Sequence, residues 1–256
     1  MKIYPIPQIS ESPDGFSPQS FKLEICAFSL TGAIDAQQAG ADRIELCAGA
    51  AEGGTTPDFA LIKTANHKLS IPVFPIIRPR GGNFCYNQSE FEMMKLSVLE
   101  CKKLGCKGVT FSILLNDLTV DADRTSQLVE LAYPMESTFI RGFDLTPDPF
   151  EALEVIKQTG CKRILTSGQK EKAHDAILLL KQLVENAGEE IIIMPGSGIN
   201  PENLKQLIEE TVAKEFHASA RKIVPNLNPF IDQFGFGNLI DCDIEKVKNM
   251  KLCFDF

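Results

Sequence analysis

Eight short apolar segments alternate with longer amphipathic segments along this chain, and this alternation constrains the fold more than any other feature. The apolar segments cover residues 23–27, 43–47, 72–78, 108–114, 137–141, 163–166, 190–194 and 214–217. Strands that alternate with helices are typical of a parallel α/β fold. Ser29, Asp148 and Asn200 are suitable N-cap residues for three of the helices. A proline follows Asp148 and Asn200 at the first helical position, where proline is favoured.

Two parallel α/β folds are compatible with this order. A closed (β/α)8 barrel, the TIM barrel, contains eight strand–helix units. An open doubly wound sheet would instead place its site where the strand order reverses, at the ends of a few strands. Polar groups here follow six or more strands. We therefore predict a single-domain TIM (β/α)8 barrel over residues 21–220, with an irregular N-terminal arm (1–20) and a C-terminal extension (221–256) that packs on the barrel.

Composition argues against several classes of partner and location. The 256 residues are 44% hydrophobic, which is enough for a large core, and the net charge is -8. An acidic surface repels phosphate backbones, so we expect no nucleic acid partner. No apolar run reaches about 18 residues, so no membrane span is expected. The N-terminal residues do not resemble a signal peptide, and the eight scattered cysteines form no CxxC pair. We therefore expect a cytoplasmic protein with reduced thiols.

Charged residues occur inside three of the predicted strands. Side chains alternate along a strand, so Arg43, Glu45 and Cys47 share one face, opposite the apolar Ile44 and Leu46. In a closed barrel the eighth strand pairs with the first, and the first with the second. Charged side chains from all three strands should then meet inside the barrel: Glu24, Arg43, Glu45, Glu215 and His217. Buried charges must pair, so we expect an interior network of these glutamates with Arg43 and Arg78.

Polar residues near the strand ends suggest a site for a small molecule. In this interpretation Glu45, Asp144 and His217 are acid/base candidates, and Arg78 binds an anion, with Arg80 as an alternative. The competing interpretation is a buried salt-bridge network that only stabilises the barrel. It applies most directly to Glu24 and Arg43, which lie deeper in their strands.

Two cysteines lie at the ends of neighbouring strands. Cys26 and Cys47 are expected on the same face, and if the strands are in register their sulfurs could lie roughly 4–6 Å apart. Two thiolates suit a soft ion such as Cu(I). The alternative is that both cysteines are small buried apolar residues, because the close ligand spacing of common metal sites is absent.

A glycine-rich loop follows the predicted seventh strand. Gly196, Ser197 and Gly198 form this loop, and Ser219 follows the eighth strand. Barrel enzymes often bind phosphate through backbone N–H groups at these two positions. The alternative is an ordinary glycine turn without a ligand.

The strand-end motifs together resemble the CutC family, which is named for copper homeostasis. They are DRIELC at 42–47, EGGTTP at 52–57, IRPRGG at 77–82, LTSGQ at 165–169, IMPG at 193–196 and EFHAS at 215–219. The resemblance extends from about residue 23 to 220. It implies a TIM barrel, a cytoplasmic location and a homodimer or larger homo-oligomer. It also implies that Cys26 and Cys47 match cysteines proposed as Cu(I) ligands in that family, for which no reaction is firmly assigned.

The chain departs from the family pattern at two positions near the expected site. Phe28 stands where the family has aspartate, and Ile140 stands where it has histidine. An isoleucine can neither transfer a proton nor bind a metal. Three functions therefore stay open: copper homeostasis with Cu(I) held by Cys26 and Cys47, an enzyme acting on a small anionic or sugar-like metabolite, and a catalytically lapsed relative of such an enzyme. The expected partners are a copper ion or a small molecule.

Overall fold

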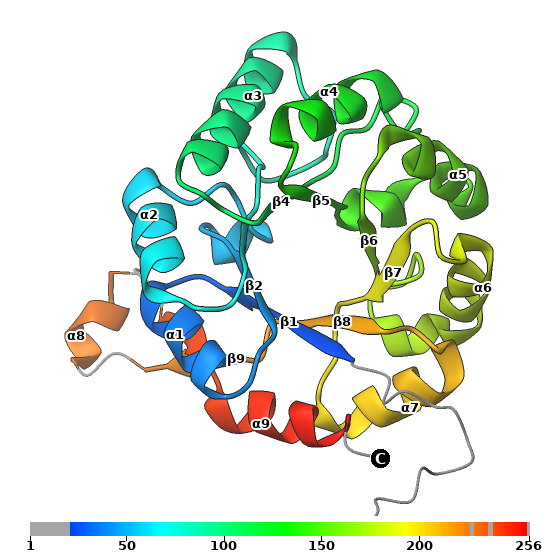
Figure 1. Ribbon diagram of the computed structural model, residues 1–256. Coiled ribbons are helices and arrows are strands. Elements are labelled where there is room, and N and C mark those ends of the chain that lie inside the picture. The colour runs from blue at the N-terminus through cyan, green and yellow to red at the C-terminus, as the bar shows by residue number, and fades with distance from the viewer. Residues whose placement is uncertain (1–20, 226–227, 235–237, 255–256) are drawn as a thin grey trace, which may run out of the picture.

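A ring of eight parallel strands lies inside a ring of helices in the computed structural model, which describes residues 21–225, 228–234 and 238–254 (Figure 1). The strands are β1 (Lys22–Ala27), β2 (Arg43–Leu46), β3 (Val73–Pro75), β4 (Gly108–Phe111), β5 (Glu136–Phe139), β6 (Arg163–Thr166), β7 (Ile192–Pro195) and β8 (Glu215–Ala218). The helices between them are α1 (Leu30–Gln38), α2 (Phe59–Lys68), α3 (Gln88–Lys103), α4 (Ala122–Ala132), α5 (Pro149–Thr159), α6 (Ile177–Ala187) and α7 (Pro201–Thr211).

The strands close into a barrel. Hydrogen bonds join β3, β2, β1 and β8 in one sheet and β4, β5, β6 and β7 in another. Two further bridges connect these sheets, between Ile76 and Thr110 and between Gly196 and His217. The predicted (β/α)8 barrel is confirmed, and the doubly wound alternative is wrong because an open sheet would leave two free edges.

Local sequence determines most of the helix starts. The side chains of Ser29, Asp148 and Asn200 each accept a backbone N–H at a helix N-terminus, as predicted. α6 begins only at Ile177, after a short 3-10 turn over Ala173–Ala176. The reason is that the Ala173 N–H donates to the Ser197 carbonyl in the loop after β7, which holds this segment out of the helix.

The interior of the barrel is filled by a few large side chains together with the charged residues. Phe74 on β3 is buried, and the guanidinium groups of Arg43 and Arg163 lie 5.1 and 5.5 Å from the centre of its ring. Gly108 on β4 makes room for that ring, because a Cβ atom there would lie 2.3 Å from Phe74. A substitution at Gly108 would therefore displace Phe74 and the arginines packed on it.

The chain continues beyond β8 into a hairpin and a last helix. β9 (Arg221–Val224) pairs antiparallel with β10 (Leu239–Cys242), with α8 (Pro229–Asp232) between them and α9 (Ile244–Leu252) after them. In α9, Val247 and Met250 are buried, and Lys251 forms an ion pair with Asp42 of 2.7 Å. The predicted N-terminal arm, residues 1–20, lies outside the described residues. Among the described helices, none has both the length and the apolar character required to cross a membrane.

Candidate functional site

The strand register brings the charged residues of β1, β2 and β8 together inside the barrel. Glu24 lies opposite Arg43 on one side and His217 on the other, and Cys26 lies opposite Glu45. The predicted meeting of these residues is confirmed. It follows from the strand order, in which β1 lies between β2 and β8.

Arg43 is the central cation of this network. It donates to Glu24 and to Glu215, the latter at 2.6 Å, and Arg163 lies 3.1 Å from the same Glu215 oxygen. Burial by itself would raise the pKa of Glu24, but the charges of Arg43 and His217 outweigh it and lower that pKa to about 2. Glu215 is held ionised by Arg43 and Arg163 in the same way, with a lowered pKa. These pairs make the deeper part of the network structural, as the competing interpretation predicted for Glu24 and Arg43.

His217 connects this network to the mouth of the barrel. Its Nδ1 lies 2.8 Å from Glu24 Oε1, and its Nε2 lies 3.8 Å from Glu45 Oε2. Burial would lower the pKa of His217, but hydrogen bonds with Cys26 and Glu24 and the charge of Glu45 raise it well above its usual value. This raised pKa favours the imidazolium form, whose Nδ1–H donates to Glu24 and whose positive charge lies beside Glu45.

Cys26 and Cys47 form a close pair beside His217. Their sulfurs lie 3.5 Å apart, and Cys47 Sγ lies 3.6 Å from Glu45 Oε2. The hydrogen bond with Cys47 and the neighbouring His217 lower the pKa of Cys26 against the effect of burial. Burial raises the pKa of Cys47 well above its usual value, so Cys47 keeps its proton and Cys26 is the more acidic thiol. Glu45 also has a raised pKa because it is buried.

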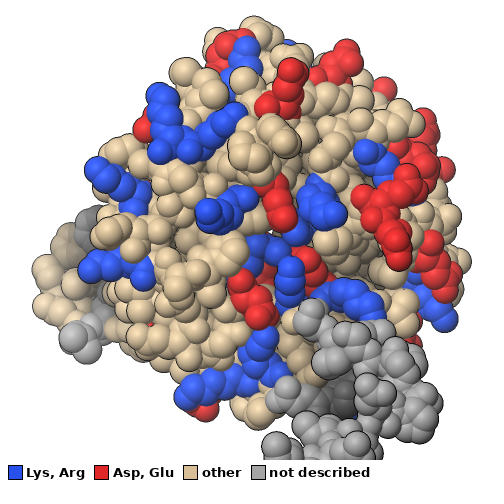
Figure 2. All heavy atoms as spheres, in the orientation of Figure 1, with Lys and Arg blue, Asp and Glu red and all other residues tan. Residues whose placement is uncertain are grey.

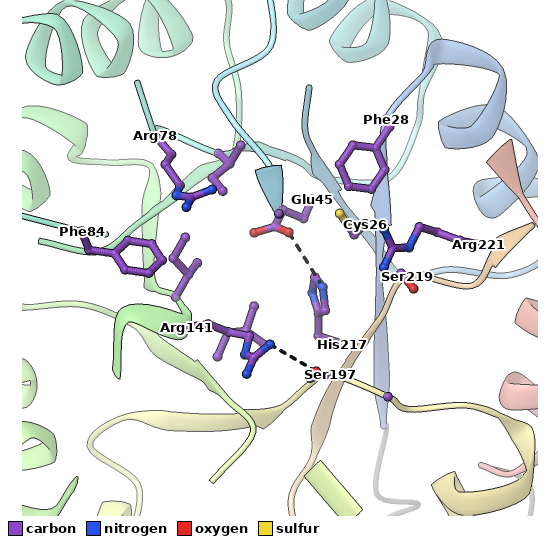
Figure 3. Close-up of a pocket in the computed structure, with 15 residues that line it drawn as sticks. Cys26, Phe28, Glu45, Arg78, Phe84, Arg141, Ser197, His217, Ser219 and Arg221 are labelled. Carbon is purple, nitrogen blue, oxygen red and sulfur yellow. Dashed lines mark hydrogen bonds and ion pairs between the residues drawn. The ribbon is translucent and has the colours of Figure 1, made fainter. Parts of the chain in front are cut away.

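A cavity of about 220 Å³ opens above this cluster at the carboxyl ends of the strands (Figure 3). The functional side chains that line it include Cys26, Glu45, Arg78, Arg141, His217 and Arg221. In Figure 2, side chains of both charges gather over the centre of the strand ring. Glu45 and His217 thus lie where a bound molecule could reach them, in the predicted acid/base positions.

Arg78 lines the cavity, but its contacts differ from those expected. Its Nη1 donates to the carbonyls of Glu52 and Gly54, and its Nη2 donates to the carbonyl of Gly82. The guanidinium also lies over the ring of Phe84, at 4.9 Å. The prediction that Arg78 pairs with the interior glutamates is therefore wrong, because three of its N–H groups donate to loop carbonyls and none contacts a described carboxylate. Arg78 thus orders the loops after β2 and β3, and its buried Nε has no hydrogen-bond partner among the described residues.

Asp144 also has a different environment from the one expected. Its carboxylate accepts the N–H groups of Ser167 and Gln169 and the Nε–H of Arg141, the last at 2.8 Å. It is not among the residues that line the cavity. The geometry therefore assigns Asp144 to holding the loop after β6 and Arg141, in place of the predicted acid/base role.

The glycine-rich loop after β7 lies partly in the site. Ser197, Gly198 and Ser219 line the cavity. Gly196 lies beneath them, where a Cβ atom would approach Leu165 to 2.3 Å and His217 to 3.2 Å. Gly196 thus permits close packing against Leu165 of β6 and His217 of β8, and it is not among the residues that line the cavity.

Sequence analysis missed two cavity arginines. Arg141 follows β5 and donates to Asp144, to Ser167 Oγ at 2.8 Å and to Ser197 Oγ at 3.2 Å. Its position directly after a strand could have identified it. Arg221 lies in the hairpin after β8 and its guanidinium is 6.0 Å from the ring centre of Phe28. No strand-end pattern identifies Arg221, because it lies beyond the eighth strand.

The fold and this cavity define a class: a (β/α)8 barrel with a polar site at the carboxyl ends of its strands. A sequence profile of the CutC family matches residues 21–222. The chain is 48% identical over 203 residues to a CutC family protein of Photorhabdus laumondii, covering 79% of this chain and 81% of the relative. It is 42% identical over 201 residues to a human copper homeostasis protein cutC homolog, covering 78% and 74%.

A solved structure agrees with these sequence relatives. A crystal structure of CutC from Streptococcus agalactiae superposes with a TM-score of 0.74 at 34% identity, covering 78% of this chain and 98% of that one. The chain belongs to the CutC family.

Proposed function

We propose that this protein takes part in copper homeostasis by binding Cu(I) between Cys26 and Cys47. The observation that supports this most strongly is the 3.5 Å separation of the two sulfurs at the mouth of the barrel. Glu45 adds an oxygen, and one ligand atom from each of the three residues lies within 4.8 Å of the others. Sulfur ligands select soft ions such as Cu(I), whereas one carboxylate favours hard ions only weakly.

The surroundings of the two cysteines also suit the binding of a Cu(I) ion. Cys26 is half-buried and lines the cavity, whereas Cys47 is buried beneath it, so an ion can enter from the cavity side. Cys47 must lose its proton when it binds a metal, and its raised pKa makes that step costly. Binding should therefore strengthen as the pH rises.

Substitution of these cysteines tests the proposal. We expect Cys26→Ser and Cys47→Ser each to weaken Cu(I) binding by about tenfold, since each removes one soft ligand. The measurement is competition for Cu(I) between the reduced protein and a chromophoric chelator, under exclusion of oxygen. Cys85→Ser is the matched control, because Cys85 is also half-buried but contacts the Leu115 carbonyl in another loop. Equal affinity in the wild type and a Cys26→Ser/Cys47→Ser double variant would contradict the proposal.

A second function is favoured by the cavity itself. Binding of Cu(I) by two thiols does not require arginines nearby. Three arginines nevertheless line the cavity: Arg78, Arg141 and Arg221. We propose as the alternative an enzyme that acts on a small anionic metabolite, with His217 as acid and Glu45 as base. Phe28 and Ile140, which replace polar residues of the family pattern, line the cavity without filling it. A thermal-shift screen with a metabolite library separates an active enzyme from a catalytically lapsed one. A compound that stabilises the wild type but not His217→Gln, and that the wild type does not convert, would favour the lapsed enzyme.

Location and assembly complete the proposal. The family assignment supports a cytoplasmic protein that forms a homodimer or larger homo-oligomer. Light scattering of the purified chain, combined with fractionation of the cells that produce it, measures both properties directly.

A further inference from the structure

The charge around the cavity contrasts with that of the whole protein. The chain has a net charge of -8. The cavity lining nevertheless contains three arginines and a histidine, with Glu45 as its one carboxylate. Asp144 balances Arg141 from outside the cavity, and Glu24 balances His217 from below. Arg221 has no carboxylate partner among the residues that the structure describes.

Arg141 and Arg221 reach this cavity from opposite sides of His217 (Figure 3). Arg141 is fixed in place by Asp144 and two serine hydroxyls, and its side chain is still 40% exposed. Arg221 is stacked near Phe28 and has no recorded hydrogen bond from its guanidinium in the described part of the chain. Arg141 is thus fixed by its partners, whereas the guanidinium of Arg221 has no hydrogen-bond partner among the described residues.

The loops after β7 and β8 add hydrogen-bond donors between the two arginines. The backbone N–H groups of Gly198 and Ser219 have no hydrogen-bond acceptor among the described residues. The Ser219 hydroxyl also lines the cavity, whereas the Ser197 hydroxyl donates to the Glu171 carbonyl at 2.7 Å and accepts from Arg141. Donors that come from several directions suit a tetrahedral oxyanion better than a planar carboxylate. This part of a (β/α)8 barrel is also where phosphate groups are frequently bound.

We propose that the cavity binds the phosphate group of a small phosphorylated metabolite between Arg141 and Arg221. Gly198 and Ser219 complete the subsite, and Ser197 holds Arg141 in place beside it. The remainder of the molecule lies over Cys26, Glu45 and His217. The cavity volume of about 220 Å³ is below the range of roughly 300–1,000 Å³ for drug-sized ligands, so the metabolite is small. This inference builds on the second function proposed above and is independent of copper.

Binding of inorganic phosphate to the purified protein tests this subsite without requiring turnover. We expect saturable binding by isothermal titration calorimetry, weakened about tenfold in Arg221→Gln, because one charge-assisted contact is lost. Lys222→Gln is the matched control, since Lys222 is the exposed neighbour on the same strand and does not line the cavity. It should bind phosphate like the wild type.

Further comparisons separate this inference from the proposed functions. Cys26→Ser should bind phosphate with unchanged affinity even if its copper binding is lost. If phosphate binds but the protein shows no measurable turnover, the phosphate subsite is supported and only the proposed enzymatic function is contradicted. The inference is overturned if phosphate does not bind saturably, if Arg221→Gln binds it as tightly as the wild type, or if acetate binds equally well.

Discussion

Replacing Arg43 by methionine should lower the free energy of unfolding by about 3–5 kcal/mol, the usual loss when one partner of a buried ion pair is removed. Arg43 is 4% exposed and donates to both Glu24 and Glu215. Without it, Glu24 is left with His217 and Glu215 with Arg163, in a region where water cannot solvate the carboxylates. Methionine fills a similar volume, so the loss measures the missing charge more than a cavity. Urea unfolding followed by circular dichroism gives the difference.

The pH dependence of this loss identifies its cause. Because the pKa of Glu24 is lowered to about 2, its contribution to stability is fully present above its ordinary pKa of 4.5. That contribution is lost as the pH falls from 4.5 towards 2. The difference between wild type and Arg43→Met should therefore be largest above pH 4.5 and shrink below it. A difference that stays constant with pH would indicate lost packing and not lost charge.

Arg80→Met is the matched control for Arg43→Met. Arg80 also pairs with a glutamate, Glu90, at 2.6 Å, but its side chain is 39% exposed. Water and salt screen such a pair, so its loss should cost about 1 kcal/mol or less. If Arg43→Met and Arg80→Met lowered the free energy of unfolding by similar amounts, burial of the Arg43 ion pairs would not explain the loss.

The barrel and its charged interior could be predicted from sequence because both depend on short-range rules. Alternation along a strand places Glu24 and Glu45 on the inner face, and the order of strands in a closed barrel makes them neighbours of His217. Neither step requires knowledge of a loop conformation. The same alternation places Cys26 and Cys47 on one face, and their sulfurs lie 3.5 Å apart, closer than the roughly 4–6 Å expected.

The mouth of the cavity was harder to predict because loops and long side chains form it. Arg78 has a flexible stem, and the loop carbonyls of Glu52, Gly54 and Gly82 decide where its guanidinium lies. Arg221 reaches the cavity because β9 pairs with the distant β10 and stays beside the barrel. These arrangements cannot be predicted from the alternation of side chains along a strand or from the residues at the strand ends.

His217→Gln should slow the alkylation of Cys26 by iodoacetamide at pH 7 by about 10- to 100-fold, because loss of the neighbouring positive charge raises the pKa of the thiol. Burial would raise the pKa of Cys26, but the hydrogen bond with Cys47 and, to a smaller extent, the neighbouring His217 lower it. Of these two neighbours, His217 is the one that carries a positive charge. Glutamine can still donate one hydrogen bond to Glu24, so the barrel interior keeps a polar partner. Mass spectrometry of the alkylated peptides measures the rate.

The same experiment contains its own control and its own pH test. Cys85 lies in the loop before α3 and contacts the Leu115 carbonyl, so its alkylation rate should not change in His217→Gln. In the wild type, the Cys26 rate should stay high as the pH falls below 9, the ordinary pKa of the thiol, and decline only at the lowered pKa. In His217→Gln that decline should move to higher pH. If it does not move, the imidazolium does not activate Cys26, and the acidity of this thiol must come from Cys47 alone.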